Sequence, residues 1–548
     1  MARVVNRQLA RRAPRSTRNP ERSAIVLVLV LIVVVMVALA GFNFAELMLT
    51  ENKATHLHGD ELRIEEAIGS GVEFLQFFLE QPAALQFESG GAFNNPTLFR
   101  GIALFPEERS SRTKTRQVRF SVVSPLAMVE GESGGIRFGV ENESGRLHLA
   151  DLLRWDQQLA GSGRKALLNF PGMTEAIADA ILDWIDSDSQ RREMGAEAEY
   201  YAGLDRPYSP RNGLPDSIDE LLLVKGVTRE LLFGADVNYN GQLDPDELAR
   251  PSASAPRATQ PTIPWASLLT IYSGRRNLNS QGLPRIDLNG MDLTKLQQQL
   301  TAALDANWAG FIIALRQNGL YAGTDSGTAG SPPVNAASGP RFTISSVLDL
   351  VGARVAIPNT TPGQPPKVYT SPLGSDPTAL GEQLPKLLDA TTVINLSVVR
   401  GGVSVNDAPR AVLCCVPGID AALADRIVAA RSAPSSSNGS SRQFPTWLVS
   451  EGLVDLSTMK SLMPNITAGG DVVRAQVVGH FDSPGPAARA EVVIDATITP
   501  ARQLTWKDLR LFGLGYPLEL LGEDGASTGD YGPRGRSNAG SGAGRNAR

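Results

Sequence analysis

The stretch NFPGMTEAIADAILDWI, residues 169–185, has a related copy in CVPGIDAALADRIVAAR, residues 415–431. The two copies carry the same residues at the positions of a predicted turn: Pro171 with Pro417, and Gly172 with Gly418. Glycine permits a tight turn with a positive φ angle, and the small alanines that follow allow two helices to approach closely. This pattern is typical of a helix-hairpin-helix, so the sequence predicts two related SAM-like helical units.

Strand patterns lie on both sides of these units. Alternating apolar residues predict strands at 116–123 and 135–141, and again at 471–481 and 489–498. The stretch from 145 to 465 between them has mostly helical patterns, and a further helical segment follows each hairpin, at 217–232 and 446–462. We therefore expect an α+β fold in which an antiparallel sheet, built from both ends of the chain, carries a large inserted helical domain.

Composition divides the chain further. Segments rich in Pro, Ser, Ala and Gly predict linkers at 251–264, 324–340, 358–377 and 433–442. The expected regions are a basic leader at 1–23, a transmembrane helix at 24–45, its amphipathic continuation at 46–82, sheet segments at 83–144 and 466–522, helical units at 145–250 and 401–465, linkers and inserted material at 251–400, and a disordered tail at 523–548.

The N-terminal region predicts a membrane anchor. Residues 1–23 carry seven arginines and one acid, and residues 24–45 are uncharged and mainly apolar. About 20 apolar residues in a helix cross the hydrocarbon core of a bilayer. Because basic flanks stay cytoplasmic, the remainder of the chain is expected across the membrane. A cleaved secretory signal and an anchor with no further role are the alternatives.

An apolar stripe continues beyond the predicted span. Its members recur at spacings of three, four or seven residues: Leu57, Ile64, Ile68, Val72, Leu75 and Leu79. Pro82 ends the pattern, so one helix is predicted from Ala24 to about Gln81. Gly69 and Gly71 weaken this helix and suggest a bend.

Charge limits the range of functions. The chain has 20% charged and 42% hydrophobic residues and a net charge of -5, which excludes a wholly disordered chain and a polytopic membrane protein. Residues 151–250 contain 19 acids and 10 bases, a net charge of -9. Such a surface repels phosphate, so the hairpins are expected to pack or to contact protein. A membrane-anchored DNA-binding or DNA-uptake protein that uses the hairpins is the alternative.

The segment DVNYNGQLDPDE, residues 236–247, fits the twelve-residue loop that binds calcium. The predicted ligands are Asp236, Asn238, Asn240, the backbone carbonyl of Gln242, Asp244 and Glu247. Gly241 holds the turn position, and Leu243 is expected to point into a core. Every ligand is an oxygen, as a hard cation requires, so we predict a structural calcium site. An Asn- and Asp-rich turn is the alternative.

No residue pattern predicts catalysis. The pair Asp186 and Asp188 is interpreted as solvated acids at a helix end, and His56, His58, His148 and His480 lack the spacing of a zinc site. Cys414 and Cys415 lie in an apolar run and are expected to be small buried side chains, with a vicinal disulfide as the alternative. The protein is therefore not expected to be an enzyme.

Several stretches together resemble the type II secretion minor pseudopilin K family. They are the Arg-flanked apolar N-terminus, ENESGRLHLADLL at 141–153, LLNFPGMTEAIADAILDWIDSDS at 167–189, AEAEYYAGLDRPYSPRNGLPDSIDELLLVKGVT at 196–228, and VSVNDAPRAVLCCVPGIDAALADRIVAAR at 403–431. The resemblance implies a pilin-like sheet with a helical insertion, in a single-pass inner-membrane protein whose N-terminus is cytoplasmic and whose C-terminal region is periplasmic.

The same resemblance implies a role in protein secretion. Such proteins cap the tip of the pseudopilus with I- and J-type minor pseudopilins, promote its assembly with other components of the secretion system, and are trimmed by prepilin peptidase. Cleavage between Ser23 and Ala24 would place Val28 at mature position 5, where the K type lacks the usual Glu. The family usually has Gly before the cut, and here Ser23 occupies that place.

Overall fold

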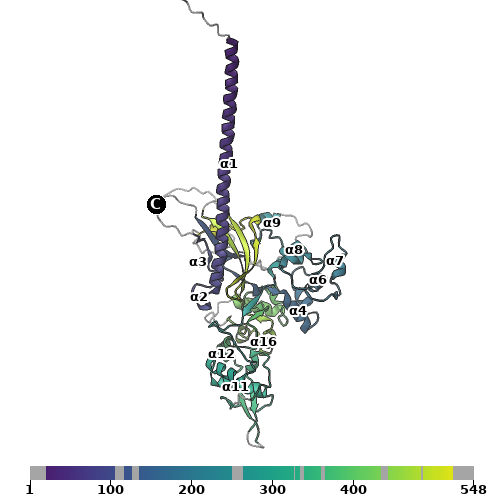
Figure 1. The fold of residues 1–548 in the computed structure, drawn as a ribbon. Coiled ribbons are helices and arrows are strands. Elements are labelled where there is room, and N and C mark those ends of the chain that lie inside the picture. Colours follow the sequence, from purple (N-terminus) through teal and green to yellow (C-terminus); the bar gives the residue numbers. More distant parts are fainter. Residues whose placement is uncertain are drawn as a thin grey trace, which may run out of the picture. The chain divides into compact units, whose positions relative to one another are not determined.

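The computed structural model describes residues 20–104, 117–125, 135–242, 244–249, 263–325, 327–333, 338–359, 364–432, 442–482 and 485–522. The chain divides into two compact units, Met1–Arg63 and Ile64–Arg548. Figure 1 shows the ribbon, with the long helix α1 in purple and the last strands of the sheet in yellow. The predicted leader up to residue 19 and the predicted tail at 523–548 lie outside the described residues.

Helix α1 (Pro20–Glu80) confirms the prediction of one long N-terminal helix. In the first unit its apolar side chains from Ile25 to Leu49 are exposed. Among the described residues, α1 is the one helix that is long and apolar enough to cross a membrane. The predicted apolar stripe is confirmed from Ile64 onward, where its members are buried, but Leu57 is exposed in the first unit, so its inclusion was wrong.

The second unit is organised around a seven-stranded antiparallel sheet. Its main order is β1 (Ile102–Ala103), β2 (Val118–Pro125), β15 (Val472–Phe481), β16 (Ala488–Asp495) and β17 (Arg502–Asp508), while β3 (Ile136–Phe138) pairs with β2 and β4 (Glu141–Asn142) pairs with β15. Val122 lies opposite Val477, so strands from the two ends of the chain are neighbours. The predicted sheet from both ends is confirmed, and β17 is an additional strand that the pattern did not predict.

The end of α1 packs on one face of this sheet. Its residues Ile64, Ile68, Val72, Leu75 and Leu79 form a core with the apolar side chains of β2, β15 and β16. A Cβ atom on Gly71 would lie 2.5 Å from Val477 and 2.9 Å from Phe120. The glycine therefore permits the close approach of helix and sheet, which is a packing reason for a residue that weakens the helix.

The opposite face of the sheet carries buried charged residues. Ala475 and Val477 face α1, so their neighbours Arg474 and Gln476 point the other way. The Arg474 guanidinium pairs with Glu143 at 2.6 Å and with Glu491 at 2.6 Å. Glu143 is wholly buried and belongs to the short 3₁₀ helix η1 (Glu143–Gly145), at the point where the chain leaves the sheet for the insertion. Buried ion pairs thus fix the start of the insertion to the sheet.

The insertion between β4 and β15 has its own hydrophobic core, which runs in sequence from Leu147 to Ile466. Its helices are α4 (Leu149–Gln158), α5 (Ser162–Leu167), α6 (Glu175–Ile185), α7 (Ala198–Ala202), α8 (Arg229–Phe233), α9 (Pro245–Ala249), α10 (Leu293–Ala303), α11 (Ala306–Asn318), α12 (Pro377–Ala390), α13 (Arg410–Leu413), α14 (Ala421–Ser432), α15 (Trp447–Ser450) and α16 (Leu456–Leu462). In Figure 1, α11 and α12 lie in a lobe away from the sheet.

Short strands also occur in this region, which was expected to be mostly helical. Within the described residues, five two-stranded sheets pair β5 (Leu147–His148) with β6 (Leu269–Thr270), β7 (Gly274–Arg276) with β12 (Val398–Arg400), β8 (Ile286–Asp287) with β11 (Thr391–Thr392), β9 (Arg354–Ile357) with β10 (Lys367–Thr370), and β13 (Val403–Ser404) with β14 (Ile466–Thr467). Strand β10 lies inside the predicted linker 358–377, because Val368 and Tyr369 bury their side chains.

The helices that flank the strands of the main sheet in sequence are α2 (Ala83–Glu88), α3 (Pro96–Phe99), α17 (Leu518–Leu521) and the 3₁₀ helix η7 (Arg510–Phe512). The 3₁₀ helices η2 (Ile218–Leu223), η4 (Trp265–Ser267) and η5 (Val347–Leu350) belong to the insertion. Tyr516 and Leu521 form a small core with Val123 and Val478 of the sheet. The end of the described chain is therefore anchored on the face opposite α1.

Candidate functional site

The loop at 236–247 brings the predicted calcium ligands together. Both carboxylate oxygens of Asp236 accept backbone N–H groups, from Asn240 at 3.2 Å and from Gly241 at 2.8 Å. Gly241 has a φ angle of 76°, so the sharp turn falls at the residue that the pattern assigns to it. These bonds fold the loop around a set of side-chain oxygens that includes Asp236.

The two acids at the end of the loop, Asp244 and Glu247, are hydrogen-bonded to the residues at its beginning. Glu247 is 6% exposed and accepts the backbone N–H groups of Val237 at 2.8 Å and Asn238 at 3.1 Å. The side-chain amides of Asn238 and Asn240 both donate to Asp244, at 2.7 and 3.1 Å. The side chains of Asp236, Asn238, Asn240, Asp244 and Glu247 thus lie in one hydrogen-bonded loop. The role of the Gln242 carbonyl stays a prediction, and Leu243 lies outside the described residues.

The electrostatics of the loop suit a divalent cation. Burial, assisted by the negative charge of Glu247, raises the pKa of Asp236 to about 6. A bound cation would offset both effects, because it stabilises the ionised carboxylate. Carboxylate and amide oxygens around a glycine turn are the donor set that calcium prefers. The residues present therefore fit the predicted ion.

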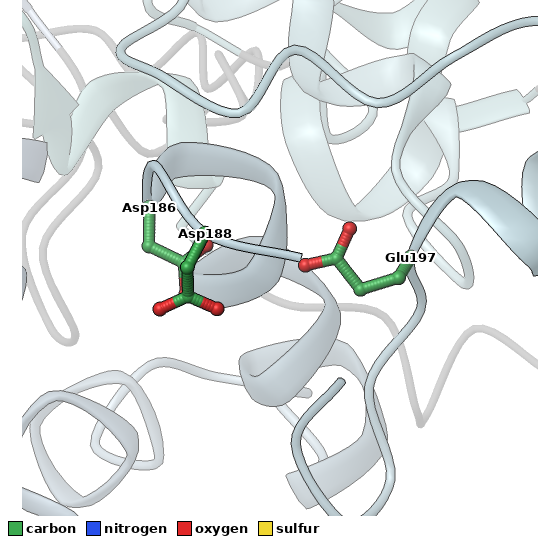
Figure 2. Close-up of side chains that lie close together, drawn as sticks. All are labelled: Asp186, Asp188 and Glu197. Carbon is green, nitrogen blue, oxygen red and sulfur yellow. The ribbon is translucent and has the colours of Figure 1, made fainter. Parts of the chain in front are cut away.

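A second group of acids lies after α6, and the sequence interpretation missed it. Asp186, Asp188 and Glu197 can each place a carboxylate oxygen within 4.8 Å of the others. Figure 2 shows Asp186 and Asp188 side by side, with the carboxylate of Glu197 directed toward them from a separate segment. Asp186 is 9% exposed, so its interpretation as a solvated acid was wrong, whereas Asp188 is exposed.

The acid of this cluster with no hydrogen-bond donor within the described chain is Glu197. Glu197 is 5% exposed, and within the described chain neither of its carboxylate oxygens has a hydrogen-bond partner. Burial and the charges of Asp183 and Asp186 raise the pKa of Glu197. The arrangement can accept a hard cation through these oxygens. The irregular spacing of the acids in sequence explains why no motif pointed to them; only the accumulation of acids between 183 and 197 was visible.

Arg192 neutralises part of this negative charge. Its guanidinium pairs with Asp183 at 2.8 Å, Asp186 at 2.5 Å and Asp156 at 3.4 Å. Asp183 is wholly buried and also accepts the backbone N–H of Ala196 at 2.9 Å. The segment between α6 and α7 is therefore held by ion pairs, while Glu197 remains without such a partner.

The comparisons identify the first part of the insertion. Residues 145–233, which include α4 to α8, the acidic cluster and the first hairpin, match the family model described as "Type II secretion system (T2SS), protein K". Residues 145–233 belong to the type II secretion system protein K family. No curated protein matches the sequence.

A solved structure is also similar to the chain. It is a chain of the GspK-GspI-GspJ complex of the Type 2 Secretion System from enterotoxigenic Escherichia coli, with 10% identity and a TM-score of 0.35 over 84% of this chain and 99% of that chain. Because this TM-score is too low to establish a common fold, the assignment of the protein K domain rests on the family model.

The turn at Pro171 and Gly172, where the sequence predicts a hairpin, packs against other parts of the same chain. Gly172 has a φ angle of 73°, and a Cβ atom there would lie 3.0 Å from Leu231. The carbonyl of Pro171 accepts the Trp265 indole N–H at 2.8 Å. In the second copy, residues 415–431, Gly418 follows Pro417, has a φ angle of 95° and approaches Leu462 in the same way. These contacts favour packing over DNA binding as the role of the turns.

Two further predictions about the hairpins and cysteines need revision. Asp179, one of the 19 acids of residues 151–250 that were expected to form a phosphate-repelling surface, is wholly buried and pairs with Arg164 at 2.5 Å, so it contributes little to the surface charge. Cys415 is buried as expected, but Cys414 is only half-buried; both are free thiols. The predicted processing site, Ser23 and Ala24, lies within α1, its side chains are outside the described set, and its cleavage stays a prediction.

Proposed function

We propose that this chain is a minor pseudopilin of a type II secretion system. The observation that carries the proposal is the position of the protein K domain, which is inserted between strands β4 and β15 of one antiparallel sheet. The apolar face of α1 covers that sheet, as expected of a pilin-like subunit. In this role the protein is a structural component and not an enzyme.

The apolar part of α1 is proposed to anchor the protein once in the inner membrane. The arginines before it would keep the N-terminus cytoplasmic and the sheet and insertion periplasmic. Prepilin peptidase is the proposed processing enzyme, with Ser23 and Ala24 at the cut. The exposed apolar side chains of α1 support this placement, because water would not favour so long an apolar surface.

We further propose that the protein caps the pseudopilus tip with I- and J-type minor pseudopilins and promotes assembly. The complex named for the similar structure contains GspI and GspJ beside GspK. A large insertion on a pilin-like sheet would obstruct the addition of another subunit above it. This is a physical reason for a cap.

Deletion of residues 145–465 is expected to leave membrane insertion intact and to impair pseudopilus assembly. The deletion retains α1, β2 and β15, which form the core between helix and sheet. Membrane fractionation, co-purification with I- and J-type pseudopilins and a secretion assay would measure the outcome, with the full chain as control. Normal assembly and secretion by a stable, membrane-inserted deletion variant would contradict the cap.

We propose that the loop at 236–247 binds calcium and that the ion is structural. At a calcium concentration about 100 times the dissociation constant, binding contributes about 2.7 kcal/mol, which would raise the melting temperature by about 2–4 °C. Glu247→Gln should remove the part of this rise in melting temperature that is due to calcium binding at the loop. Asp246→Asn is the matched control, because it makes the same change of charge on the exposed neighbouring residue.

Glu197→Gln tests the acidic cluster separately in the same melting experiment. If Glu247→Gln retains the full calcium response while Glu197→Gln loses it, the ion binds at the acidic cluster and the proposal for the loop is wrong. A melting temperature of the parent chain that does not respond to calcium would contradict both sites.

A further inference from the structure

The calcium-type loop lies directly on the sheet. The Gln476 side-chain amide donates to the Tyr239 carbonyl at 2.7 Å, and the Arg489 guanidinium donates to the same carbonyl at 3.2 Å and to the Asn238 carbonyl. Gln476 belongs to β15 and Arg489 to β16, so the two central strands both hold the loop. The carbonyls at these two loop positions are not among the predicted ligands, so the contacts are compatible with a bound ion.

Arg489 contributes a buried positive charge beside the loop. It is wholly buried, and within the described chain its hydrogen bonds end on neutral oxygens: the Asn238, Tyr239 and Gly513 carbonyls and the Gln476 amide oxygen. A buried guanidinium needs nearby negative charge. The three acidic ligands of the loop exceed this single positive charge by two, which is the charge of one calcium ion.

The same contacts reach the end of the described chain. Asn240 donates from its amide nitrogen to the Gly515 carbonyl at 2.9 Å. The Tyr516 hydroxyl donates to Gln476 at 2.8 Å, and the Phe512 ring lies 5.2 Å from the Tyr239 ring, measured between centroids. The segment 510–521, called here the C-terminal segment, therefore rests on the loop as well as on the sheet.

Asn240 connects the ligand set to this segment through a single side chain. Its amide oxygen occupies a predicted ligand position, and its amide nitrogen is the donor to Gly515. The nitrogen also donates to Asp244 at 3.1 Å. Because this nitrogen carries two hydrogens, it can donate to Asp244 and to Gly515 at the same time, so an ion that fixes the amide oxygen also fixes the donor to Gly515.

We propose that the loop is a calcium-dependent clamp that holds the C-terminal segment on the sheet, with Asn240 as the coupling residue. The inference rests on the proposed calcium site and adds a consequence of its occupancy. Calcium would order the loop, and the ordered loop would fix residues 510–521 in two ways. Asn240 donates to the Gly515 carbonyl, and the Arg489 guanidinium donates both to loop carbonyls and to the Gly513 carbonyl.

Hydrogen exchange measured by mass spectrometry on the full chain in detergent tests this clamp. Added calcium is expected to slow exchange in peptides covering 236–247, and to slow exchange in 510–521 about fivefold, the factor expected when one hydrogen bond, from Asn240 to Gly515, becomes fixed. Glu247→Gln should lose both effects. Asn240→Asp keeps an oxygen ligand but removes the donor to Gly515, so calcium should protect its loop and not its C-terminal segment.

The outcomes separate the clamp from the calcium site. Protection of 236–247 without protection of 510–521 in the parent chain would overturn the clamp and leave the calcium site standing. Equal protection of 510–521 in Asn240→Asp and in the parent chain would also overturn it. No calcium effect on 236–247 would refute the site on which the clamp depends.

Discussion

Replacing Arg474 with leucine is expected to lower the free energy of unfolding by about 3–5 kcal/mol, because it leaves a wholly buried carboxylate, Glu143, and a partly buried one, Glu491, without their cation. Arg474 pairs with Glu143 and Glu491, and Glu143 is wholly buried where the insertion begins. Denaturant unfolding of the full chain in detergent, followed by fluorescence, would measure the loss.

The pH dependence of this variant provides a second measurement. Burial alone would raise the pKa of Glu143 and of Glu491, but the Arg474 guanidinium outweighs burial and holds both pKa values below their usual range. In the parent chain the stabilisation is therefore complete above the unfolded pKa of about 4.3 and is lost as the pH falls through the lower folded values. In Arg474→Leu the buried carboxylates should have raised pKa values, so the deficit should shrink as the pH falls.

Arg410→Leu is the control for removing an ion-paired arginine. Arg410 pairs with Asp425 at 2.5 Å, but both side chains are about half exposed, so water replaces the lost partner. A much smaller loss than in Arg474→Leu is expected. Equal losses in Arg410→Leu and Arg474→Leu would contradict the importance of burial.

Gly401→Val should be comparably damaging, with a loss of about 3–5 kcal/mol. Gly401 has a φ angle of 73°, and a Cβ atom there would lie 2.6 Å from a carboxylate oxygen of Asp151. Asp151 is 4% exposed and accepts the backbone N–H of Gly402 at 2.8 Å. Valine would combine backbone strain with displacement of this buried acceptor. Thermal and denaturant unfolding would both report the change.

Gly282→Val separates these two contributions. Gly282 has almost the same φ angle, 77°, but a Cβ atom there would meet nothing within 4 Å. Only the strain of a left-handed backbone should appear, about 1–2 kcal/mol. If both valine variants lose the same stability, the contact with Asp151 contributes nothing.

Local patterns predicted much of this protein. The apolar stripe from Ile64 to Leu79 identified the face of α1 that meets the sheet, and alternation in 471–481 and 489–498 identified its two central strands. The compact fold of the loop at 236–247 was also predictable, because the residues that form it are close in sequence, whereas its binding of calcium stays a prediction. Each of these features depends on a periodicity or spacing within about 15 residues, as regular helices, strands and ion-binding loops do.

Features that depend on distant residues were not predictable. Strand β17 has an exposed, charged pattern, and its pairing with β16 is what makes it a strand. Arg474 and Glu143 are separated by most of the insertion, and Glu197 meets Asp186 only because the chain folds back after α6. When separate segments of the chain bury an acid together, the sequence around that acid has no periodic apolar pattern. Such an acid cannot be distinguished from a solvent-exposed acid by its sequence.

The interrupted sheet also sets an order of folding. Strand β2 can pair with β15, where Val122 lies opposite Val477, only after the whole insertion has been synthesised. The chain therefore has to close a very long loop to complete the sheet. The insertion has a separate hydrophobic core and can begin to fold while the last strands are still missing. Such non-local pairing is slow, and until it occurs the apolar face of α1 from Ile64 to Leu79 has no sheet to cover it. The last 50 or so described residues therefore control when the nascent protein covers this apolar face of α1.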